Sequence, residues 1–284
     1  MKALNRRSFI ATAGAGLAAG AILPGRALPA SATFHTPKAV KTLELGLASY
    51  STREFSLDDT IKMTQRLGLK HLGLKSFHLP LTSTEAECKT AAAKIREAGI
   101  DFYTAGVIYL KTKDEVDQAY RYARACGIRY ITGSPSNEML PYCDEYAKKF
   151  NIGLAIHNHG PGDDLNPTVP SIYEKVKNLD QRIGICMDIG HVVRLNRDPV
   201  AEFKQCFDRI IDLHIKDVSE ATEKGDTIEM GRGVINLPAF FRTVLAMDYK
   251  GMGSFEYEKD AKDPLPGLAE SVGYVHGVLA TLKI

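Results

Sequence analysis

Four short stretches in the second half of the chain are rich in histidine, carboxylate or lysine side chains. They are His157-Asn158-His159, Asp188-Ile189-Gly190-His191, His214-Ile215-Lys216-Asp217 and Glu256-Tyr257-Glu258. Imidazole nitrogens combined with carboxylate oxygens suit Mn, Zn, Co or Fe(II), whereas Ca prefers oxygen ligands alone. A metal held by such a set acts as a Lewis acid. The residue types therefore indicate one divalent cation with a chemical role.

Strand geometry decides which side chains of the first two stretches face the same way. Alternation places His157 and His159 on one side of a strand and Asn158 on the other. Asp188 ends the apolar run IGICM, where an unpaired buried carboxylate is costly, and the following glycine permits a turn that brings His191 back over it. Either histidine of the pair could instead be a hydrogen-bonded structural residue, and Asp188 could cap the next helix.

The other two stretches follow the same logic. His214 and Lys216 share one face of their strand, and Glu256 and Glu258 share one face of theirs. Charged residues are common at strand ends, so each residue alone is a weak signal. Their occurrence on four successive strands is what predicts a mixed site of two histidines, one aspartate and one glutamate.

The elements that must position these residues alternate regularly along the chain, as in repeated βα units. We expect eight strands, at residues 43–50, 71–77, 101–107, 130–134, 153–159, 183–188, 210–217 and 251–258. We expect helices at 57–67, 84–98, 113–126, 137–150, 171–178, 199–207, 237–247 and 266–282. Glycines just past several helices, as in RLGLK, EAGID and ACGIR, mark their ends.

Eight such units predict an α/β fold, a single (β/α)8 TIM barrel over residues 33–284. An open doubly wound sheet would have fewer strands and a glycine-rich turn after the first one, where this chain has LASYSTREF. The active site of a barrel lies at the C-terminal ends of its strands. Five of the eight histidines fall at or just beyond the expected strand ends: His78, His157, His159, His191 and His214.

The N-terminus has the features of an export signal. The pair Arg6-Arg7 precedes a weakly apolar run from Phe9 to Leu23, and Ala30-Ser31-Ala32 has the form of a signal-peptidase site. Twin arginines in this position resemble a Tat signal. A membrane anchor is the alternative, but the Gly- and Ala-rich run is too short to span about 30 Å of hydrocarbon. We expect a cleaved signal at residues 1–32 and a periplasmic mature protein.

Charge and cysteine content exclude several classes of protein. The signal contains Lys2, Arg6, Arg7 and Arg26 and no acid, so its removal changes the formal charge from +2 to −2. A mildly acidic chain gives no electrostatic reason to expect nucleic acid as a partner. The five cysteines include no CxxC pair, which argues against a zinc knuckle or a disulfide framework and favours buried unpaired thiols.

The chain beyond the signal resembles the sugar phosphate isomerase/epimerase family, whose members share a xylose-isomerase-like TIM barrel. The motifs that carry the resemblance are HNHG (157–160), MDIGH (187–191), LHIKD (213–217), GRGVIN (231–236) and FEYE (255–258). Members bind one divalent metal at the ends of the fifth to eighth strands. The resemblance therefore implies the metal ligands His157, Asp188, His214 and Glu256. It also implies that the substrate lies near His191, Lys216 and Arg232.

One departure from the family pattern concerns the base. Epimerases and isomerases of the family usually carry a glutamate where this chain has His157, and that glutamate is one of two acid/base groups. A metal-bound imidazole has no free lone pair, so another group must remove the proton. We expect His159 to be this base, with Glu256 or Lys216 as second choices. Two residues at the end of the second strand, Lys75 and His78, are expected to hold substrate hydroxyls or to protonate an oxygen, although Lys75 could equally be a structural ion-pair partner.

The resemblance predicts a metal-dependent enzyme that removes a proton alpha to a sugar carbonyl. Because sugar phosphates are mainly intracellular, an exported member is expected to act on an unphosphorylated sugar or a keto-glycoside. The outcome is isomerisation, epimerisation, or elimination and hydration of a 3-keto-glycoside. A phosphorylated sugar stays an alternative, since Gly231-Arg232-Gly233 lies near where barrels often bind phosphate.

Two other classes remain as alternatives. Endonuclease IV-type enzymes share the barrel but grip phosphates with basic loops, which the charge balance opposes. A non-catalytic periplasmic sugar-binding barrel would have little need for four convergent metal ligands. The expected partner is thus a small-molecule sugar or glycoside. No apolar stretch predicts a stable membrane span, and the sequence leaves the oligomeric state open.

Overall fold

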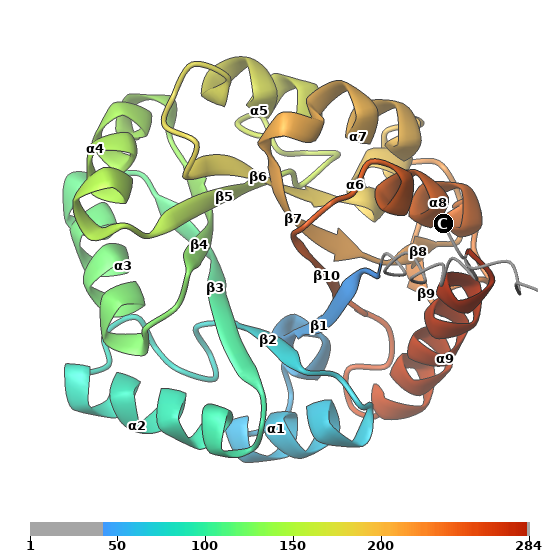
Figure 1. Ribbon diagram of the computed structural model, residues 1–284, viewed down its shortest axis with the longest axis horizontal. Coiled ribbons are helices and arrows are strands. Elements are labelled where there is room, and N and C mark those ends of the chain that lie inside the picture. Colours follow the sequence, from blue (N-terminus) through green and yellow to red (C-terminus); the bar gives the residue numbers. More distant parts are fainter. Residues whose placement is uncertain (1–41, 283–284) are drawn as a thin grey trace, which may run out of the picture. The chain divides into compact units, whose positions relative to one another are not determined.

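Eight parallel strands close into a barrel in the computed structural model, which describes residues 42–282 (Figure 1). Around the barrel the strands follow the order β1-β10-β7-β6-β5-β4-β3-β2. Their bounds are β1 Glu44–Ala48, β2 His71–Leu74, β3 Asp101–Leu110, β4 Tyr130–Pro135, β5 Gly153–His157, β6 Ile183–Asp188, β7 Ile210–Ile215 and β10 Met252–Phe255. The predicted TIM barrel is confirmed, and each predicted strand overlaps an observed one.

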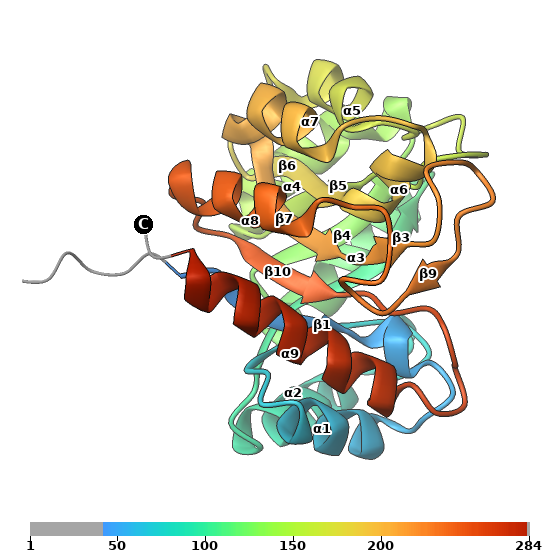
Figure 2. The same ribbon diagram turned by 90° about the vertical axis from the view of Figure 1, so that its right-hand side faces the viewer.

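Helices surround this barrel on all sides (Figures 1 and 2). Their bounds are α1 Leu57–Arg66, α2 Glu85–Glu97, α3 Lys113–Cys126, α4 Leu140–Phe150, α5 Val169–Val176, α6 Ile189–Arg194, α7 Pro199–Cys206, α8 Leu237–Ala246 and α9 Leu265–Thr281. Eight of them match the predicted helices to within about two residues, the segment before α4 being a short 3-10 helix at Asn137–Met139. The short helix α6 and the two-stranded hairpin of β8 (Asp217–Val218) and β9 (Thr227–Ile228) were not predicted.

Local sequence signals explain the sharp helix boundaries. Reciprocal capping boxes begin three helices: α2 with Thr84 and Glu87, α3 with Thr112 and Glu115, and α5 with Thr168 and Ser171. Gly127 ends α3 in the left-handed conformation, at φ 65°, which a residue with a Cβ adopts only at a cost. Because these signals lie within a few residues of each helix end, the helices could be predicted closely from the sequence.

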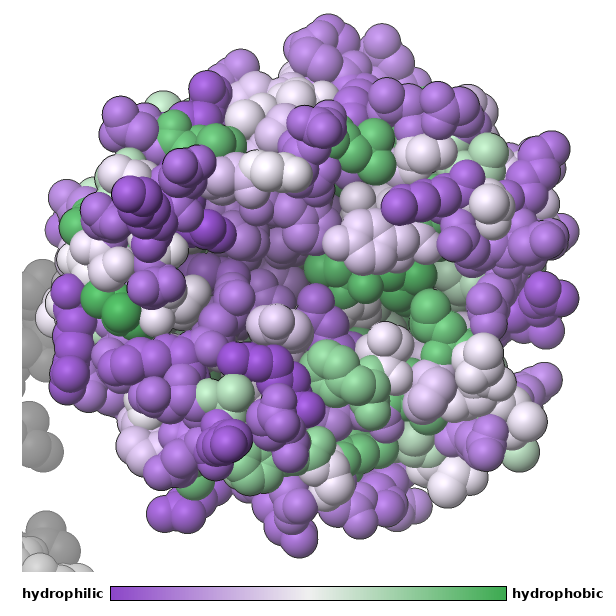
Figure 3. Space-filling model, turned by 180° about the vertical axis from the view of Figure 1, so that it is seen from behind, coloured by the Kyte–Doolittle hydropathy of each residue, from purple (hydrophilic) through white to green (hydrophobic). Residues whose placement is uncertain are grey.

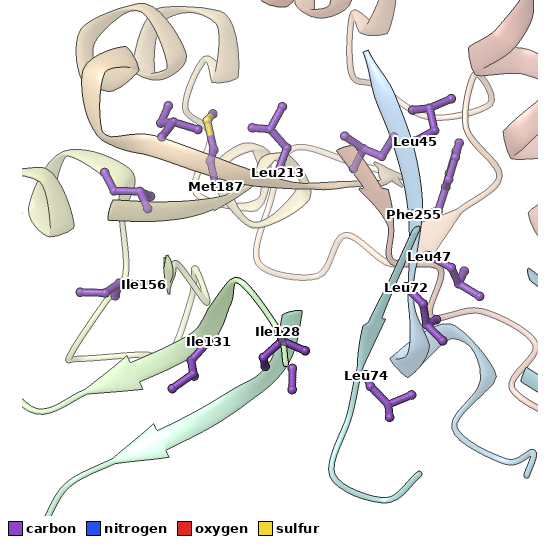
Figure 4. Packing of buried hydrophobic residues seen from close by; sticks show 14 of the residues in the cluster. Leu45, Leu47, Leu72, Leu74, Ile128, Ile131, Ile156, Met187, Leu213 and Phe255 are labelled. Carbon is purple, nitrogen blue, oxygen red and sulfur yellow. The ribbon is translucent and has the colours of Figure 1, made fainter. Parts of the chain in front are cut away.

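Strand alternation separates an apolar outer face from a polar interior. Ile156, Met187 and Leu213 are fully buried and belong to the hydrophobic core, several of whose side chains are seen in Figure 4. Each such side chain contributes roughly 1.5–3 kcal/mol when it leaves water. Since neighbouring residues on a strand face opposite ways, the residues next to these three point into the barrel.

The barrel interior beneath the site holds a buried polar network. The hydroxyl of Tyr103 contacts Ser254 Oγ closely and donates to Oδ1 of Asp212 at 3.5 Å. The thiol of Cys186 donates to Oδ2 of Asp212 at 3.6 Å. Burial raises the pKa of Asp212 to about 6, although His214 acts in the opposite direction. The apolar core therefore lies between the barrel and its helices, and polar groups fill the barrel itself.

Three further sequence predictions concern the export signal, the cysteines and a membrane span. The predicted export signal at residues 1–32 lies outside the described residues. All five cysteines are buried and unpaired, as predicted. Within residues 42–282, no helix has the length and apolar character needed to cross a bilayer.

One carboxylate ties the long loop after β7 to the barrel. Asp217 in β8 accepts backbone N–H groups from Val218 and Ile235 on Oδ1 and from Gly231 and Gly233 on Oδ2, at 2.9–3.2 Å. A Cβ on Gly233 would lie 2.2 Å from Oδ1 of Asp217, so this close approach requires glycine. The LHIKD and GRGVIN motifs thus form one structural unit.

Replacement of Asp217 tests this unit. Asp217→Ala would leave four backbone N–H groups without their acceptor, three of them in the loop, and we expect it to reduce the free energy of unfolding by about 2–4 kcal/mol. Urea unfolding followed by circular dichroism measures this loss. The exposed Asp263 provides the control, since Asp263→Ala should change stability by less than about 0.5 kcal/mol. A loss below about 1 kcal/mol for Asp217→Ala would show that the loop holds itself in place.

Candidate metal centre and active-site pocket

Four ligand-type side chains meet where β5, β6, β7 and β10 end. Nε2 of His157 lies 3.1 Å from Nδ1 of His214 and 3.5 Å from Oδ2 of Asp188. Nδ1 of His214 lies 3.1 Å from Oε2 of Glu256. One ligand atom from each residue lies within 4.8 Å of all the others. The structure thus brings together the four residues that the sequence analysis assigned to a metal.

These spacings fit a shared cation. Atoms bound to one ion at about 2.0–2.2 Å lie roughly 3.0–3.5 Å from one another. Oδ2 of Asp188 faces the cluster, is buried and makes no hydrogen bond among the described residues, although Nζ of Lys216 lies 2.9 Å away. Buried polar atoms are normally satisfied, so this oxygen has capacity to bind an ion beside Lys216. The four residues could therefore hold one metal ion.

Asp188 has two roles at once. Its Oδ1 accepts the backbone N–H of His191 at 2.9 Å and so caps helix α6, while Oδ2 faces the cluster. Its backbone N–H donates to Oδ1 of Asn158 at 2.8 Å, and its carbonyl accepts from Nδ2 of Asn158 at 3.1 Å. The helix cap and the ligand position, which the sequence analysis treated as alternatives, are both present.

Burial and neighbouring charges shift the pKa values of these residues in different directions. Burial holds the pKa of His157 well below its ordinary value, which keeps a lone pair on the imidazole. Burial also opposes the charged form of His214, but the carboxylate of Glu256 outweighs it and raises the pKa. Burial would raise the pKa of Glu256 itself, yet Lys216 and His214 hold it well below its usual range. The carboxylates are thus ionised and ready to bind a cation.

Lys216 is the charge that balances the cluster. Its ammonium lies 2.9 Å from Oδ2 of Asp188 and 3.0 Å from Oε2 of Glu256, and it contacts Glu258 closely. Burial disfavours the ammonium, but these three carboxylates raise the pKa of Lys216 well above its ordinary value. Lys216 is therefore a permanent cation in this arrangement.

A pocket of about 260 Å³ opens beside the cluster. It is lined by Tyr50, Lys75, Val107, Tyr109, His157, His159, His191, Glu256 and Glu258. Figure 3 views the molecule from the side opposite to Figure 1 and shows a hollow with hydrophilic surroundings near the middle of that face. The pocket is of a size to take a small polar molecule in contact with the cluster.

His159 reaches this pocket with a partner that the sequence analysis missed. Its Nδ1 lies 2.8 Å from Oδ2 of Asp163, and its ring stacks on Tyr109 at 6.0 Å between centroids. Burial lowers the pKa of His159, while Asp163 acts in the opposite direction. Asp163 follows His159 by four residues in a loop, and no strand or helix periodicity connects the two in the sequence.

Lys75 and His191 also line the pocket, as predicted for substrate-binding residues. Nζ of Lys75 lies 3.9 Å from Oε1 of Glu256 and 5.1 Å from the centre of the Tyr50 ring. Nε2 of His191 lies 3.9 Å from Oδ2 of Asp188. Both side chains could donate hydrogen bonds to hydroxyl groups of a bound molecule.

Two of the predicted substrate residues are not brought to the pocket. His78 is enclosed by Ser49 Oγ on Nδ1, and by Thr60 Oγ1 and the Thr52 carbonyl on Nε2, at 3.0–3.3 Å. Arg232 is exposed, and Glu270 holds its guanidinium with two contacts of 2.5 and 2.7 Å. Neither lines the pocket. His78 was assigned from its position just beyond a strand end and Arg232 from the GRGVIN motif, but local contacts direct both side chains elsewhere.

Comparisons with known proteins agree with this fold. The family model described as xylose isomerase-like TIM barrel matches residues 104–276. The rhizopine catabolism protein MocC of Rhizobium meliloti is 27% identical over 149 residues, 46% of this chain and 44% of that protein. Inosose dehydratase of Lactiplantibacillus plantarum is 26% identical over 157 residues, 48% of this chain and 51% of that protein. The chain thus spans about half the length of these curated relatives.

Solved structures with the same fold cover nearly the whole described chain. A structure of the IOLI protein with a bound zinc atom gives a TM-score of 0.71 at 15% identity, covering 84% of this chain and 99% of that one. A 3-keto-D-glucoside 4-epimerase from E. coli gives 0.67 at 14% identity, covering 83% of this chain and all of that one. At these identities the likeness establishes the shared barrel.

Replacement of Lys216 tests the charge balance of the cluster. Lys216→Met keeps the length of the side chain but leaves the buried carboxylates of Asp188 and Glu256 uncompensated. We expect the free energy of unfolding to fall by about 3–5 kcal/mol, measured in EDTA so that no cation replaces the ammonium. The matched control is Lys62→Met on the surface of α1, which should change stability by less than about 0.5 kcal/mol. Equal stability of the two variants would contradict this account of the cluster.

Proposed function

The chain belongs to the xylose isomerase-like TIM barrel family, and on this premise we propose that it is a divalent-metal-dependent enzyme. The reaction we assign to it is removal of a proton alpha to a carbonyl of an unphosphorylated sugar or keto-glycoside. The observation that carries the proposal is the convergence of four buried ligand-type side chains beside a pocket that also contains His159. A plain sugar-binding barrel would have no use for that combination.

The residues present suit a metal of the Mn, Zn, Co or Fe(II) type. Two imidazoles and two carboxylates form the donor set: His157, Asp188, His214 and Glu256. When bound, such an ion supplies Lewis-acid stabilisation of the negative charge that develops on a sugar oxygen during proton removal. The low pKa values of His157 and Asp188 keep both residues in the unprotonated form that ligation requires.

His159 is the residue best placed to take the proton. It lines the pocket, and the carboxylate of Asp163, 2.8 Å from Nδ1, would favour the tautomer that carries its proton on Nδ1 and leaves the lone pair for catalysis on Nε2. Lys216 is held as a cation by three carboxylates and has no lone pair to offer. Glu256 is engaged by His214 and Lys216. The structure therefore supports the first choice of base over the two alternatives.

Lys75 and His191 are suited to hold the sugar in place. Their nitrogens lie at the edge of the cluster, so they could bind the hydroxyl or carbonyl oxygens next to the reacting carbon. Tyr50 and Tyr109 border the same pocket and would exclude water from one face of the bound sugar ring. These groups orient the C–H bond toward His159.

The substrate class follows from charge and from the proposed export. The predicted substrate-binding arginine, Arg232, is paired with Glu270 away from the pocket, which removes the clearest candidate for phosphate binding. We further propose that residues 1–32 direct the folded enzyme to the periplasm, where unphosphorylated sugars and glycosides are the available substrates. The names of the relatives, a dehydratase and an epimerase, support a reaction that begins with loss of a proton next to a carbonyl.

Elimination is the outcome that needs only one base. In a 3-keto-glycoside, His159 would take the proton from C2, the C–H electron pair would form the C1=C2 double bond, and the C1–O bond would break. The departing oxygen keeps the bonding pair and takes up a proton to leave as an alcohol. No oxidant or reductant is required, and one base suffices in place of the two carboxylates of an epimerase.

Metal content and isotope exchange test the proposal together. The purified enzyme should hold about one equivalent of divalent metal and exchange the C2 proton of methyl 3-keto-β-D-glucoside in D2O. His157→Ala and Asp188→Ala should lose both the metal and the exchange, since each removes a ligand. His276→Ala, on the exposed face of α9, is the matched control and should keep both. A metal-free wild-type enzyme that still exchanges the proton would rule out the metal-dependent mechanism.

The role of His159 is tested separately from metal binding. His159→Asn should keep its metal but lower the exchange rate by about 10²–10⁴, the usual contribution of a general base. Asp163→Asn should cause a smaller loss, because the base is present but less well oriented. Unchanged exchange in His159→Asn would exclude this residue as the base and return Glu256 to consideration.

A further inference from the structure

A second cavity adjoins the pocket beside the cluster. It has a volume of about 540 Å³, twice that of the first, and His191 and Glu258 line both. Its other lining residues are Arg194, Lys216, Gly225, Asp226, Thr227, Ile228 and Lys259. They come from α6, from the β8–β9 hairpin and from the segment after β10, which lie on one side of the barrel in Figure 2. A molecule bound at the cluster can therefore extend into this cavity.

The walls of the second cavity are held in place by backbone and side-chain contacts. The backbone N–H of Asp226 donates to Ser219 Oγ at 3.0 Å, and its carbonyl accepts the N–H of Ser219 at 2.9 Å. Arg194 donates to the Glu223 carbonyl at 2.7 Å, while its Nε is buried and has no hydrogen-bond partner among the described residues. A Cβ on Gly225 would lie 2.3 Å from the Glu220 carbonyl, so the turn of the hairpin requires glycine.

The walls of this cavity carry charges of both signs, with three cations: Arg194, Lys216 and Lys259. Lys259 is paired with Glu229 at 2.8 Å, and Lys216 lies among carboxylates. Asp226 and Glu258 add two negative charges to the same walls. A phosphate would meet these carboxylates as well as the cations, and its binding would be weakened by repulsion. Mixed donors and acceptors at close quarters instead match a neutral molecule with many hydroxyl groups.

We propose that the second cavity is a subsite for a second sugar ring, so that the preferred substrate is a two-ring keto-glycoside. This inference rests on the proposed function and names the substrate class of that site. The reactive keto ring occupies the pocket beside His159, and the ring on the other side of the glycosidic bond lies between Arg194, Asp226 and Thr227. On elimination the C1–O bond breaks between the two rings, and the second ring leaves as a free sugar with its oxygen reprotonated.

Paired substrates test the subsite. The non-reducing-end 3-keto derivative of cellobiose and methyl 3-keto-β-D-glucoside carry the same reactive ring and differ only in the leaving group. We expect kcat/KM for release of the leaving alcohol to be at least about 10-fold higher for the two-ring compound, since only that compound can fill the second cavity. Equal values for the two substrates would overturn the subsite, even where isotope exchange on the one-ring compound upholds the proposed function.

Substitutions in the walls of the second cavity test whether its residues cause the preference for the two-ring substrate. Asp226→Ala and Thr227→Val should each lower kcat/KM for the two-ring substrate about 10-fold, with the C2 exchange rate of the one-ring substrate unchanged. Asp263→Ala lies in a different, exposed part of the chain and serves as the matched control. Equal losses on both substrates would show that these residues support the fold or the first pocket, and would contradict the assignment.

A binding measurement separates failure of the subsite from failure of the proposed chemistry. Calorimetry with unreacted cellobiose and with glucose needs no turnover, and we expect tighter binding of cellobiose that Asp226→Ala abolishes. Equal binding of the two sugars would overturn the inference. Competition by inorganic phosphate that disappears in Arg194→Met would also overturn it, because the cavity would then be an anion site.

Discussion

The mutual neutralisation of Lys216 with the carboxylates of Asp188, Glu256 and Glu258 is the interaction on which the site depends. The barrel end buries Lys216, Asp188 and Glu256 away from water, where an unpaired charge costs several kcal/mol. One ammonium and three carboxylates give the cluster a net negative charge, which suits the binding of a divalent cation. The neutral imidazole of His157 beside them supplies a nitrogen donor without adding charge.

The polar interior of the barrel follows from the same arrangement. His214 and Lys216 face inward on β7, so the alternate residue Asp212 faces inward too, one layer deeper. Tyr103 and Cys186 contact that carboxyl group, and burial raises its pKa to about 6. The apolar residues of the same strands are left to pack against the helices. The inward faces of these strands therefore hold the site, and their outward faces supply the apolar packing that stabilises the fold.

Much of the fold and the heart of the site could be predicted from the sequence. β6 ends at Asp188 as expected, and strand alternation points His157 into the barrel. β5 ends at His157, two residues earlier than predicted, so His159 reaches the pocket from the loop that follows. Capping boxes and glycine C-caps locate the helices, because these signals are local. Helix α6 was missed since it is only six residues long, and its N-cap, Asp188, was already assigned to the metal site. The β8–β9 hairpin was missed because two-residue strands have no readable periodicity.

What the sequence determined by itself is the eight barrel strands, eight of the helices and the inward position of the four metal-type ligands, because periodicity and helix caps depend on residues close together in the chain. Only the tertiary structure decided which side chains share the pocket. It enclosed His78 among hydroxyl groups, paired Arg232 with Glu270, joined Asp163 to His159 and placed a second cavity beside the first. Each of these outcomes depends on where a loop folds relative to residues distant in sequence, and no local pattern encodes that distance.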